Sequence, residues 1–299
     1  MKLATTTGDF VQYTTSQEEC MEYIARSGFK NVDYNFCQDY NWKNGVFSTD
    51  CKNHLENVKR KADALGVTFV QAHSPMGAPI APGNETFTEA TKRCIECCAE
   101  LGIPNIVVHS GYIPNITKEE AFEKNKVFFM ELLRFAEQYH VNVLVENFNK
   151  MCVDGLYWID NATDLRALID YVNHPLFHAC WDAGHGNMQE MPQDEALRIL
   201  GEHVYALHIQ DNLGTDDSHI APFCGSLNLD AVMHGLMDIN YKGYFTFESG
   251  NILLPASCRR PFEKDQRLAK APLELRIKAE NLLYEMGKYI LEAYDCFEE

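Results

Sequence analysis

Short apolar stretches alternate with longer amphipathic ones along the whole chain. Eight of the short stretches are rich in β-branched and aromatic residues, as strands are, and the segments between them have apolar residues at helical spacing. The predicted strands cover residues 3–7, 31–36, 68–73, 105–109, 142–146, 178–182, 205–208 and 244–248. Strands that alternate with helices are typical of βαβ units, so a parallel sheet is expected.

Local signals at helix ends support this alternation. Helices are predicted over residues 50–65, 86–101 and 118–139, with Asp50, Thr86 or Thr88, and Thr117 as their capping residues. Gly66 and Gly102 directly follow the first two of these segments, and glycine in that position commonly ends a helix. A last amphipathic helix is predicted over residues 272–294.

The chain shows no internal boundary between domains. No linker rich in proline, glycine or serine divides it, so one domain over residues 1–299 is expected. Eight strand–helix units in one domain predict a (β/α)₈ TIM barrel, with the last helix closing the barrel or lying at a subunit contact of a homo-oligomer. A doubly wound sheet is disfavoured because it would carry a glycine-rich loop after the first strand, where only Gly8 stands.

Six predicted strands end on a histidine or a carboxylate. In a barrel the carboxyl ends of the strands meet at one rim, so these side chains are expected to converge. Grouping so many titratable side chains is unfavourable unless something neutralises them, and a divalent cation does so by direct ligation. The six residues are His73, His109, Glu146, Asp182, His208 and Glu248.

The carboxylates in this set indicate the kind of metal. Glu146, Asp182, His208 and Glu248 would form a mainly oxygen site, which suits Mn²⁺, Mg²⁺ or Co²⁺ and is compatible with Zn²⁺. Further polar residues are predicted to hold additional cations or to bind a polyhydroxylated substrate, although a solvated acidic loop is the alternative for Asp216 and Asp217. These further residues are His73, His109, His185, Asp217 and His219.

Charge argues against polyanionic partners. The 299 residues include 26 basic and 43 acidic side chains, a net charge of −17. Such a chain repels phosphate backbones and anionic lipids, so neither a nucleic acid nor a membrane is the expected partner.

The N-terminus and the cysteines indicate the compartment. The first residues lack the apolar core of a secretory signal, and the cysteine count, eleven, is odd. Reduced thiols and a cytoplasmic location are therefore expected. Cys94, Cys97 and Cys98 resemble a metal-binding or redox motif, but they are predicted to lie on the buried face of one helix.

Seven segments resemble the xylose isomerase-like TIM barrel superfamily. They are AHSPMG (72–77), VVHSG (107–111), VENF (145–148), WDAGH (181–185), LHIQD (207–211), DSHIAPFCG (217–225) and FTFES (245–249). That superfamily includes sugar isomerases, ketose 3-epimerases, inosose dehydratases and AP endonucleases. The resemblance implies one metal held by Glu146, Asp182, His208 and Glu248, with the two glutamates as acid and base on opposite faces of a sugar.

The expected function is a metal-dependent isomerase or epimerase of a small sugar or sugar phosphate. Proton transfer would pass through a metal-stabilised enediolate, with His185 polarising a substrate oxygen. Phe148, Trp181 and Phe247 are predicted either to face the sugar or to pack in the core. A phosphate site or simple exposure to solvent is expected for Arg259, Arg260 and Arg267.

Three alternatives share much of this apparatus. An inosose dehydratase-type lyase or a hydroxypyruvate isomerase fits every residue named, because substrate choice depends on the loops. An AP endonuclease-like phosphodiesterase is implied by nine residues that resemble its zinc ligands, and the negative charge disfavours it. A carbohydrate receptor without catalysis is the third. The chain differs from the usual glycine-rich end of the D-x-H motif in having Phe223-Cys224-Gly225 after Pro222. It differs from the ketose epimerases in lacking an arginine in the loop after His208.

Overall fold

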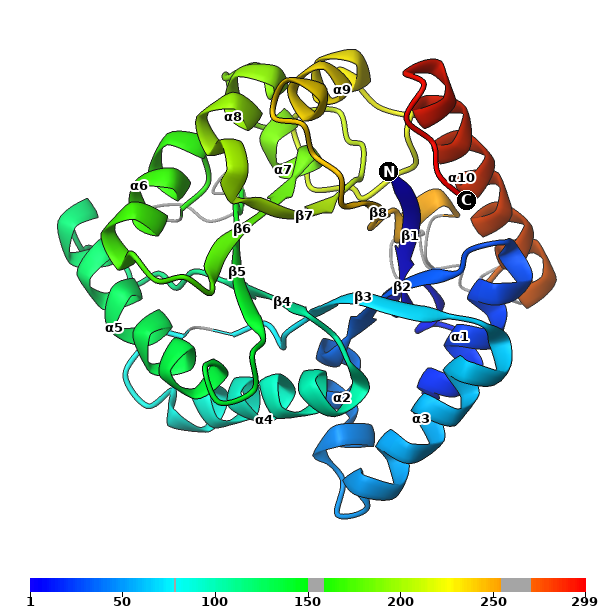
Figure 1. Cartoon of the computed structure of the whole chain (residues 1–299), viewed down its shortest axis with the longest axis horizontal. Coiled ribbons are helices and arrows are strands. Elements are labelled where there is room, and N and C mark those ends of the chain that lie inside the picture. The colour runs from blue at the N-terminus through cyan, green and yellow to red at the C-terminus, as the bar shows by residue number, and fades with distance from the viewer. Residues whose placement is uncertain (78, 150–158, 254–269) are drawn as a thin grey trace, which may run out of the picture.

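The computed structural model describes residues 1–77, 79–149 and 159–299. Within these residues eight strands lie side by side in the order β7-β6-β5-β4-β3-β2-β1-β8, and neighbouring strands in this order are parallel. Between β7 and β8 the barrel is joined just beyond β7, where Ile209 N donates to Thr246 O at 2.8 Å and Glu248 N donates to Ile209 O at 3.0 Å. The (β/α)₈ TIM barrel prediction is confirmed, and helices ring the strands (Figure 1).

The eight strands agree with the predicted ones to within one residue at each end. They are β1 Lys2–Thr6, β2 Asn31–Asn35, β3 Thr68–His73, β4 Asn105–His109, β5 Asn142–Glu146, β6 Phe177–Asp182, β7 Val204–His208 and β8 Tyr244–Phe247. The helices are α1 Gln17–Ser27, α2 Phe36–Trp42, α3 Cys51–Leu65, α4 Glu85–Leu101, α5 Lys118–Ala136, α6 Ala162–Val172, α7 Ala183–Asn187, α8 Gln193–Leu200, α9 Leu229–Asp238 and α10 Leu273–Ala293. The 3₁₀ helices of the described residues are η1 Thr7–Phe10, η2 Gly45–Phe47, η3 Gly201–His203 and η4 Gly250–Ile252.

Most helix ends follow the predicted signals. Thr117 forms a capping box with Glu120 at the start of α5, and Gly66 and Gly102 end α3 and α4 in the left-handed conformation. Asp50 stands at the start of α3, but its side chain makes no capping hydrogen bond.

Two helix boundaries were predicted wrongly. Helix α4 begins at Glu85, so Asn84 rather than Thr86 or Thr88 stands at the cap, and Thr88 is buried within the helix. Helix α5 stops at Ala136, and His140 then takes a left-handed φ of 55° that turns the chain toward β5.

The apolar side chains fill two layers. A small cluster is formed by four residues from neighbouring strands, Val107, Leu144, Cys180 and Ala206. The large core cluster contains buried side chains from both the strands and the helices. Trp181 and Phe247 belong to the large cluster, so the core prediction is confirmed for both. Cys94, Cys97 and Cys98 are buried on α4 as predicted, and the nine cysteines in the described part of the chain are free thiols.

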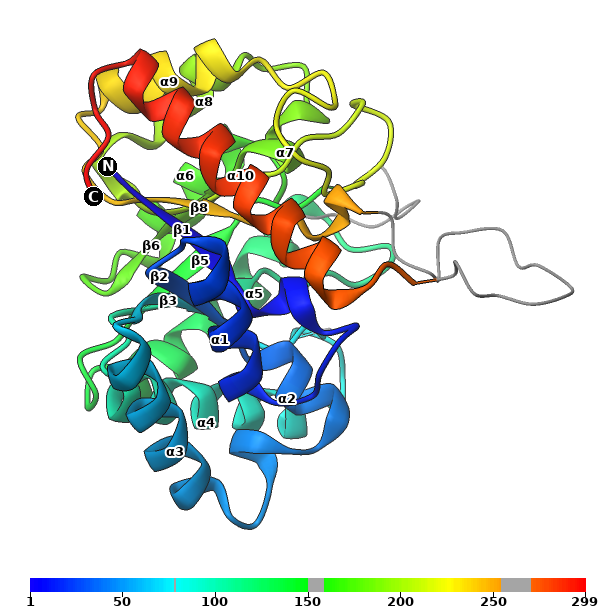
Figure 2. The same cartoon turned by 90° about the vertical axis from the view of Figure 1, so that its right-hand side faces the viewer.

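Helix α10 runs beside α1 and joins the last part of the chain to the first (Figures 1 and 2). Its buried Arg276 forms ion pairs through Nη2 with Asp9 Oδ2 at 3.1 Å and with Glu280 Oε2 at 2.8 Å. Thr5 Oγ1 in turn donates to Glu280 Oε1 at 2.6 Å. A buried cluster of charges therefore ties α10 to β1 and η1.

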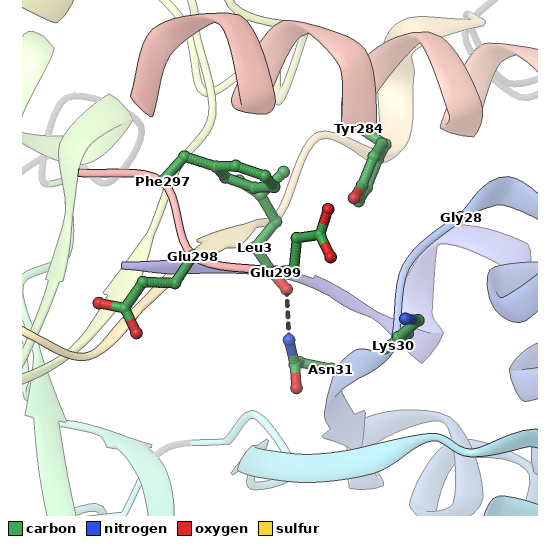
Figure 3. A pocket seen from close by; sticks show the side chains of 8 residues that line it. All are labelled: Leu3, Gly28, Lys30, Asn31, Tyr284, Phe297, Glu298 and Glu299. Carbon is green, nitrogen blue, oxygen red and sulfur yellow. Dashed lines mark hydrogen bonds between the residues drawn. The ribbon is translucent and has the colours of Figure 1, made fainter. Parts of the chain in front are cut away.

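The amino-terminal end of the barrel carries a separate cavity of about 170 Å³. Leu3 and Asn31, at the starts of β1 and β2, line it together with Tyr284 of α10 and the last residues of the chain (Figure 3). The described residues include no helix that is both long and apolar enough to cross a membrane.

Candidate metal centre and active site

The carboxyl ends of the strands surround a cavity of about 200 Å³. Parallel strands bring residues from distant parts of the sequence to this rim, and short segments after β2 and β7 complete its wall. The lining residues are Asn35, Cys37, Gln38, His73, Met76, His109, Glu146, Phe148, His185, Asp217, His219 and Glu248.

Glu146, the last residue of β5, lies at the centre of the buried polar groups. Its Oε2 is 2.6 Å from His109 Nε2 and 3.4 Å from His73 Nε2, and its Oε1 is 2.7 Å from His208 Nδ1. Burial alone would raise the pKa of Glu146, but His208 and His109 outweigh burial and hold it well below its usual range. Glu146 is therefore a carboxylate at neutral pH.

Asp182 is the last residue of β6, and only one of its two carboxylate oxygens accepts a hydrogen bond. Its Oδ1 accepts a hydrogen bond from His185 N at 2.7 Å, whereas its buried Oδ2 has no hydrogen-bond partner and lies 3.7 Å from His185 Nδ1. Burial raises the pKa of Asp182 to about 6. A buried carboxylate oxygen without a hydrogen bond is unfavourable in a folded protein unless something else binds it.

A third group of side chains extends the site across the mouth. His185 Nε2 is 3.2 Å from Asp217 Oδ2, and Asp217 Oδ1 is 3.2 Å from His219 Nε2. His219 has a left-handed φ of 47°, and its Nδ1 lies 2.9 Å from the backbone oxygen of Glu248. Asp217 is thus held between two imidazoles, and the solvated-loop alternative is wrong for this residue.

The protonation of His185 follows from its neighbours. Burial lowers the pKa of this imidazole, but Asp182, Asp217 and Glu146 together raise it to about 10. Its Nδ1 lies 2.8 Å from Asn147 O, so that backbone oxygen fixes the ring while Nε2 faces the cavity-lining Asp217.

Among the residues that the structure describes, four sets of side chains place their ligand atoms within 4.8 Å of one another. One is Glu146, Asp182, His208 and Glu248, the set expected from the sequence. The donor chemistry of this set is three carboxylates and one imidazole, and Asp182 Oδ2 is buried without a hydrogen bond. Both features fit a hard or borderline divalent cation. The other sets are His73 with His109 and Glu146, His185 with Asp217 and His219, and Glu146 with Cys180 and His208.

All nine predicted site residues lie close together at the rim. The amide side chains that hydrogen-bond two of them, Asn147 and Gln210, were not predicted. Asn147 Oδ1 accepts from Asp182 N at 2.7 Å, and Gln210 Nε2 donates to Asp217 Oδ1 at 2.9 Å. Both amides directly follow or lie close to a predicted ligand in the sequence, and that adjacency was the signal that could have identified them.

Of the three aromatic residues predicted to face the sugar or the core, Phe148 is the one that lines the cavity. Its ring centroid lies 4.9 Å from that of His109 and 5.1 Å from that of His185. The suggested phosphate-binding residues Arg259, Arg260 and Arg267 lie outside the described residues.

Comparisons with known proteins agree with this fold. A family profile described as "xylose isomerase-like TIM barrel" matches residues 21–270. An uncharacterized protein of Methanocaldococcus jannaschii is 28% identical over 64% of this chain and 65% of its own length. Fructoselysine 3-epimerase of Escherichia coli O157:H7 is 27% identical over 47% of this chain and 49% of its own length. The chain thus spans less than two thirds of each of these curated relatives.

Two solved structures share the fold over almost the whole chain. D-psicose 3-epimerase with D-tagatose, from Clostridium cellulolyticum H10, has a TM-score of 0.76 at 17% identity and covers 97% of this chain and 99% of its own. A 3-keto-D-glucoside 4-epimerase of E. coli has a TM-score of 0.70 at 19% identity and covers 95% of this chain and 99% of its own.

Proposed function

Because the chain belongs to the xylose isomerase-like TIM barrel family, we propose that it is a divalent-metal-dependent epimerase or isomerase of a small sugar. The observation that carries the proposal is the ligand set of Glu146, Asp182, His208 and Glu248 at the carboxyl ends of four strands, with a buried oxygen of Asp182 that has no hydrogen bond. Mn²⁺, Mg²⁺, Co²⁺ and Zn²⁺ all match these donors.

The two glutamates are the proposed proton carriers. A cation bound by the four ligands would supply Lewis acidity, which makes a C–H bond beside a sugar carbonyl more acidic. Glu146 is ionised and can accept that proton, while Glu248 can return one from another side of the cavity. His185 faces the same cavity through Nε2 and can donate a hydrogen bond to a substrate oxygen.

The relatives support a ketose as the substrate. Those named above are described as epimerases of psicose, fructoselysine and a 3-keto-glucoside, all of which carry a ketone beside the carbon to be inverted. Inversion at such a carbon requires removal and return of one proton, which matches the two glutamates. A dehydratase would use the same first proton transfer, so it is the second candidate.

Metal removal tests the proposal directly. Dialysis against EDTA should abolish epimerisation of a ketose panel, and Mn²⁺ or Co²⁺ should restore it because the cation acidifies the substrate. Elemental analysis before and after dialysis gives the metal content. Returning metal at about 100 times its Kd should also stabilise the fold by roughly 2.7 kcal/mol, seen as a higher Tm. Full activity in protein shown to be metal-free would contradict the proposal.

The same measurement tests the phosphodiesterase alternative. The nine gathered residues offer more ligands than one cation needs, and three of the four sets share Glu146. Three zinc ions per chain together with nicking of an abasic DNA duplex would favour that alternative, against which the net charge of −17 argues.

Charge in the cavity predicts selectivity for unphosphorylated substrates. Glu146, Asp217 and Glu248 line it, and neither lysine nor arginine is among the described lining residues. We expect a ketose 6-phosphate to bind at least about tenfold more weakly than the free ketose, a loss of roughly 1.4 kcal/mol. The described lining offers the phosphate no lysine or arginine, and the charge of the His185 imidazolium is already neutralised by Asp182 and Asp217. Competition assays measure the ratio, and the uncharged 6-O-methyl ketose separates charge from bulk. Tighter binding of the phosphate would refute this expectation.

A further inference from the structure

Beneath the metal ligands, a second layer of buried polar side chains crosses the interior of the barrel. Asp33 on β2 and Gln71 on β3 are register partners, and Thr246 lies on β8. All three side chains are at most 2% exposed. Gln71 Oε1 accepts a hydrogen bond from Thr246 Oγ1 at 3.2 Å, and Gln71 Nε2 donates to Asp33 Oδ2 at 2.8 Å. This layer therefore holds Asp33 in a fixed position.

The same oxygen of Asp33 reaches one of the ligands above it. Asp33 Oδ2 is 3.1 Å from His208 Nε2, while the opposite ring nitrogen, Nδ1, is 2.7 Å from Glu146 Oε1 and 3.6 Å from Glu248 Oε2. Only Nδ1 therefore faces the other candidate ligands. His208 is 1% exposed, so its ring has no solvent to satisfy either nitrogen.

We infer that Asp33 is a positioning residue that makes His208 a metal ligand through Nδ1. The inference rests on the proposed function, because it assumes a cation among Glu146, Asp182, His208 and Glu248. Ligation uses the lone pair of Nδ1, so the remaining ring hydrogen is on Nε2, where the Asp33 carboxylate accepts it. A carboxylate accepts this bond more strongly than a neutral oxygen would and makes the imidazole a better donor to the metal.

Gln71 could compete for the same nitrogen, since its Nε2 lies 3.1 Å from His208 Nε2. Donation from Gln71 would need a bare Nε2 and would place the hydrogen on Nδ1, which blocks ligation. The bond from Thr246 turns the Gln71 amide so that its nitrogen can donate to Asp33 Oδ2, and that carboxylate remains the acceptor for His208.

Replacement of Asp33 tests the inference with Co²⁺ as the probe. Asp33→Asn keeps the shape but removes the charge, and we expect the Co²⁺ Kd, measured by calorimetry, to rise by roughly 10- to 100-fold. The matched control is Asp39→Asn, since Asp39 is equally buried, at 1% exposed, but bonds Gln17 and Tyr34 instead. Its Kd should not change. Should Asp33→Asn fail to fold, Thr246→Val loosens Gln71 and should give a smaller rise in Kd.

A spectroscopic measurement separates positioning from a purely structural role. In Zn²⁺-loaded, ¹⁵N-histidine-labelled protein, the His208 ring should carry its hydrogen on Nε2, and His208→Gln assigns the signal. If the Co²⁺ Kd of folded Asp33→Asn stays within about twofold of the wild-type value, the loss of the carboxylate bonded to His208 has no effect on metal binding, and the inference alone is overturned. A hydrogen on Nδ1 of His208 in the Zn²⁺-loaded protein would also overturn the inference alone. Wild-type protein that binds no Co²⁺ would overturn the proposed function together with it.

Discussion

Glu146→Gln should lose almost all turnover while the barrel still folds. The substitution removes both the carboxylate that accepts the substrate proton and an anionic metal ligand, and it retains the volume of the side chain. General base catalysis alone is worth about 10²–10⁴-fold in rate, so kcat on the best ketose should fall by at least that range. Circular dichroism and Tm verify the fold, and chemical quenching followed by sugar chromatography gives the rate.

Glu248→Gln separates the two proton transfers. If Glu146 and Glu248 serve different faces of the sugar, this variant should still exchange the substrate C–H with deuterated solvent faster than it forms epimer. Glu202→Gln on the exposed surface is the control and should be fully active. A double Glu146→Gln, Glu248→Gln variant with wild-type turnover would exclude the proposed mechanism.

Arg276→Ala should be the most destabilising of the single substitutions considered. It leaves the carboxylates of Asp9 and Glu280 buried without their cation, and breaking such a buried pair typically costs roughly 3–5 kcal/mol. Urea unfolding followed by tryptophan fluorescence measures the loss. Arg26→Ala is the matched control in the same helix pair, because Arg26 and Glu274 form an exposed ion pair, and it should cost at most about 1 kcal/mol.

The loss in free energy of unfolding caused by Arg276→Ala should also become smaller as the pH falls. Burial, followed by the charge of Glu280, raises the pKa of Asp9 well above its usual range, and Arg276 opposes both. A carboxyl group whose folded pKa is raised favours folding at low pH, and this contribution is lost as the pH rises through the folded pKa. Without the arginine that pKa rises further. Urea unfolding should show a smaller difference in free energy of unfolding between the variant and the wild type at pH 5 than at pH 7. An equal difference at both pH values would rule out this explanation.

The sequence predicts the fold closely because the barrel repeats one local pattern. Each strand is a short apolar run, so all eight could be located within a residue, and the six strand-end ligands followed from the rule that parallel strands share an edge. Helix ends were less predictable where several capping residues stand close together, as Asn84, Thr86 and Thr88 do before and within α4.

What the sequence did not predict are contacts fixed only by closure of the barrel. Asp33 and Gln71 lie inside strands rather than at their ends, and His208 is 175 positions from Asp33. Nothing local distinguishes Asp33 from a polar residue that faces solvent. Trp181 and Phe247 present the same difficulty, since an aromatic residue at a strand end can face either the cavity or the helices.

The tie between α10 and the start of the chain has a consequence for how the protein is made. Thr5 bonds Glu280 across 275 positions, and β1 pairs with β8, so the first strand meets its final partners only when the last tenth of the chain has left the ribosome. Closing so long a loop is slow, and until then β1 exposes an unpaired edge. The nascent chain thus has an extended interval in which chaperones can bind that edge, and this interval can end only after β8 has been synthesised.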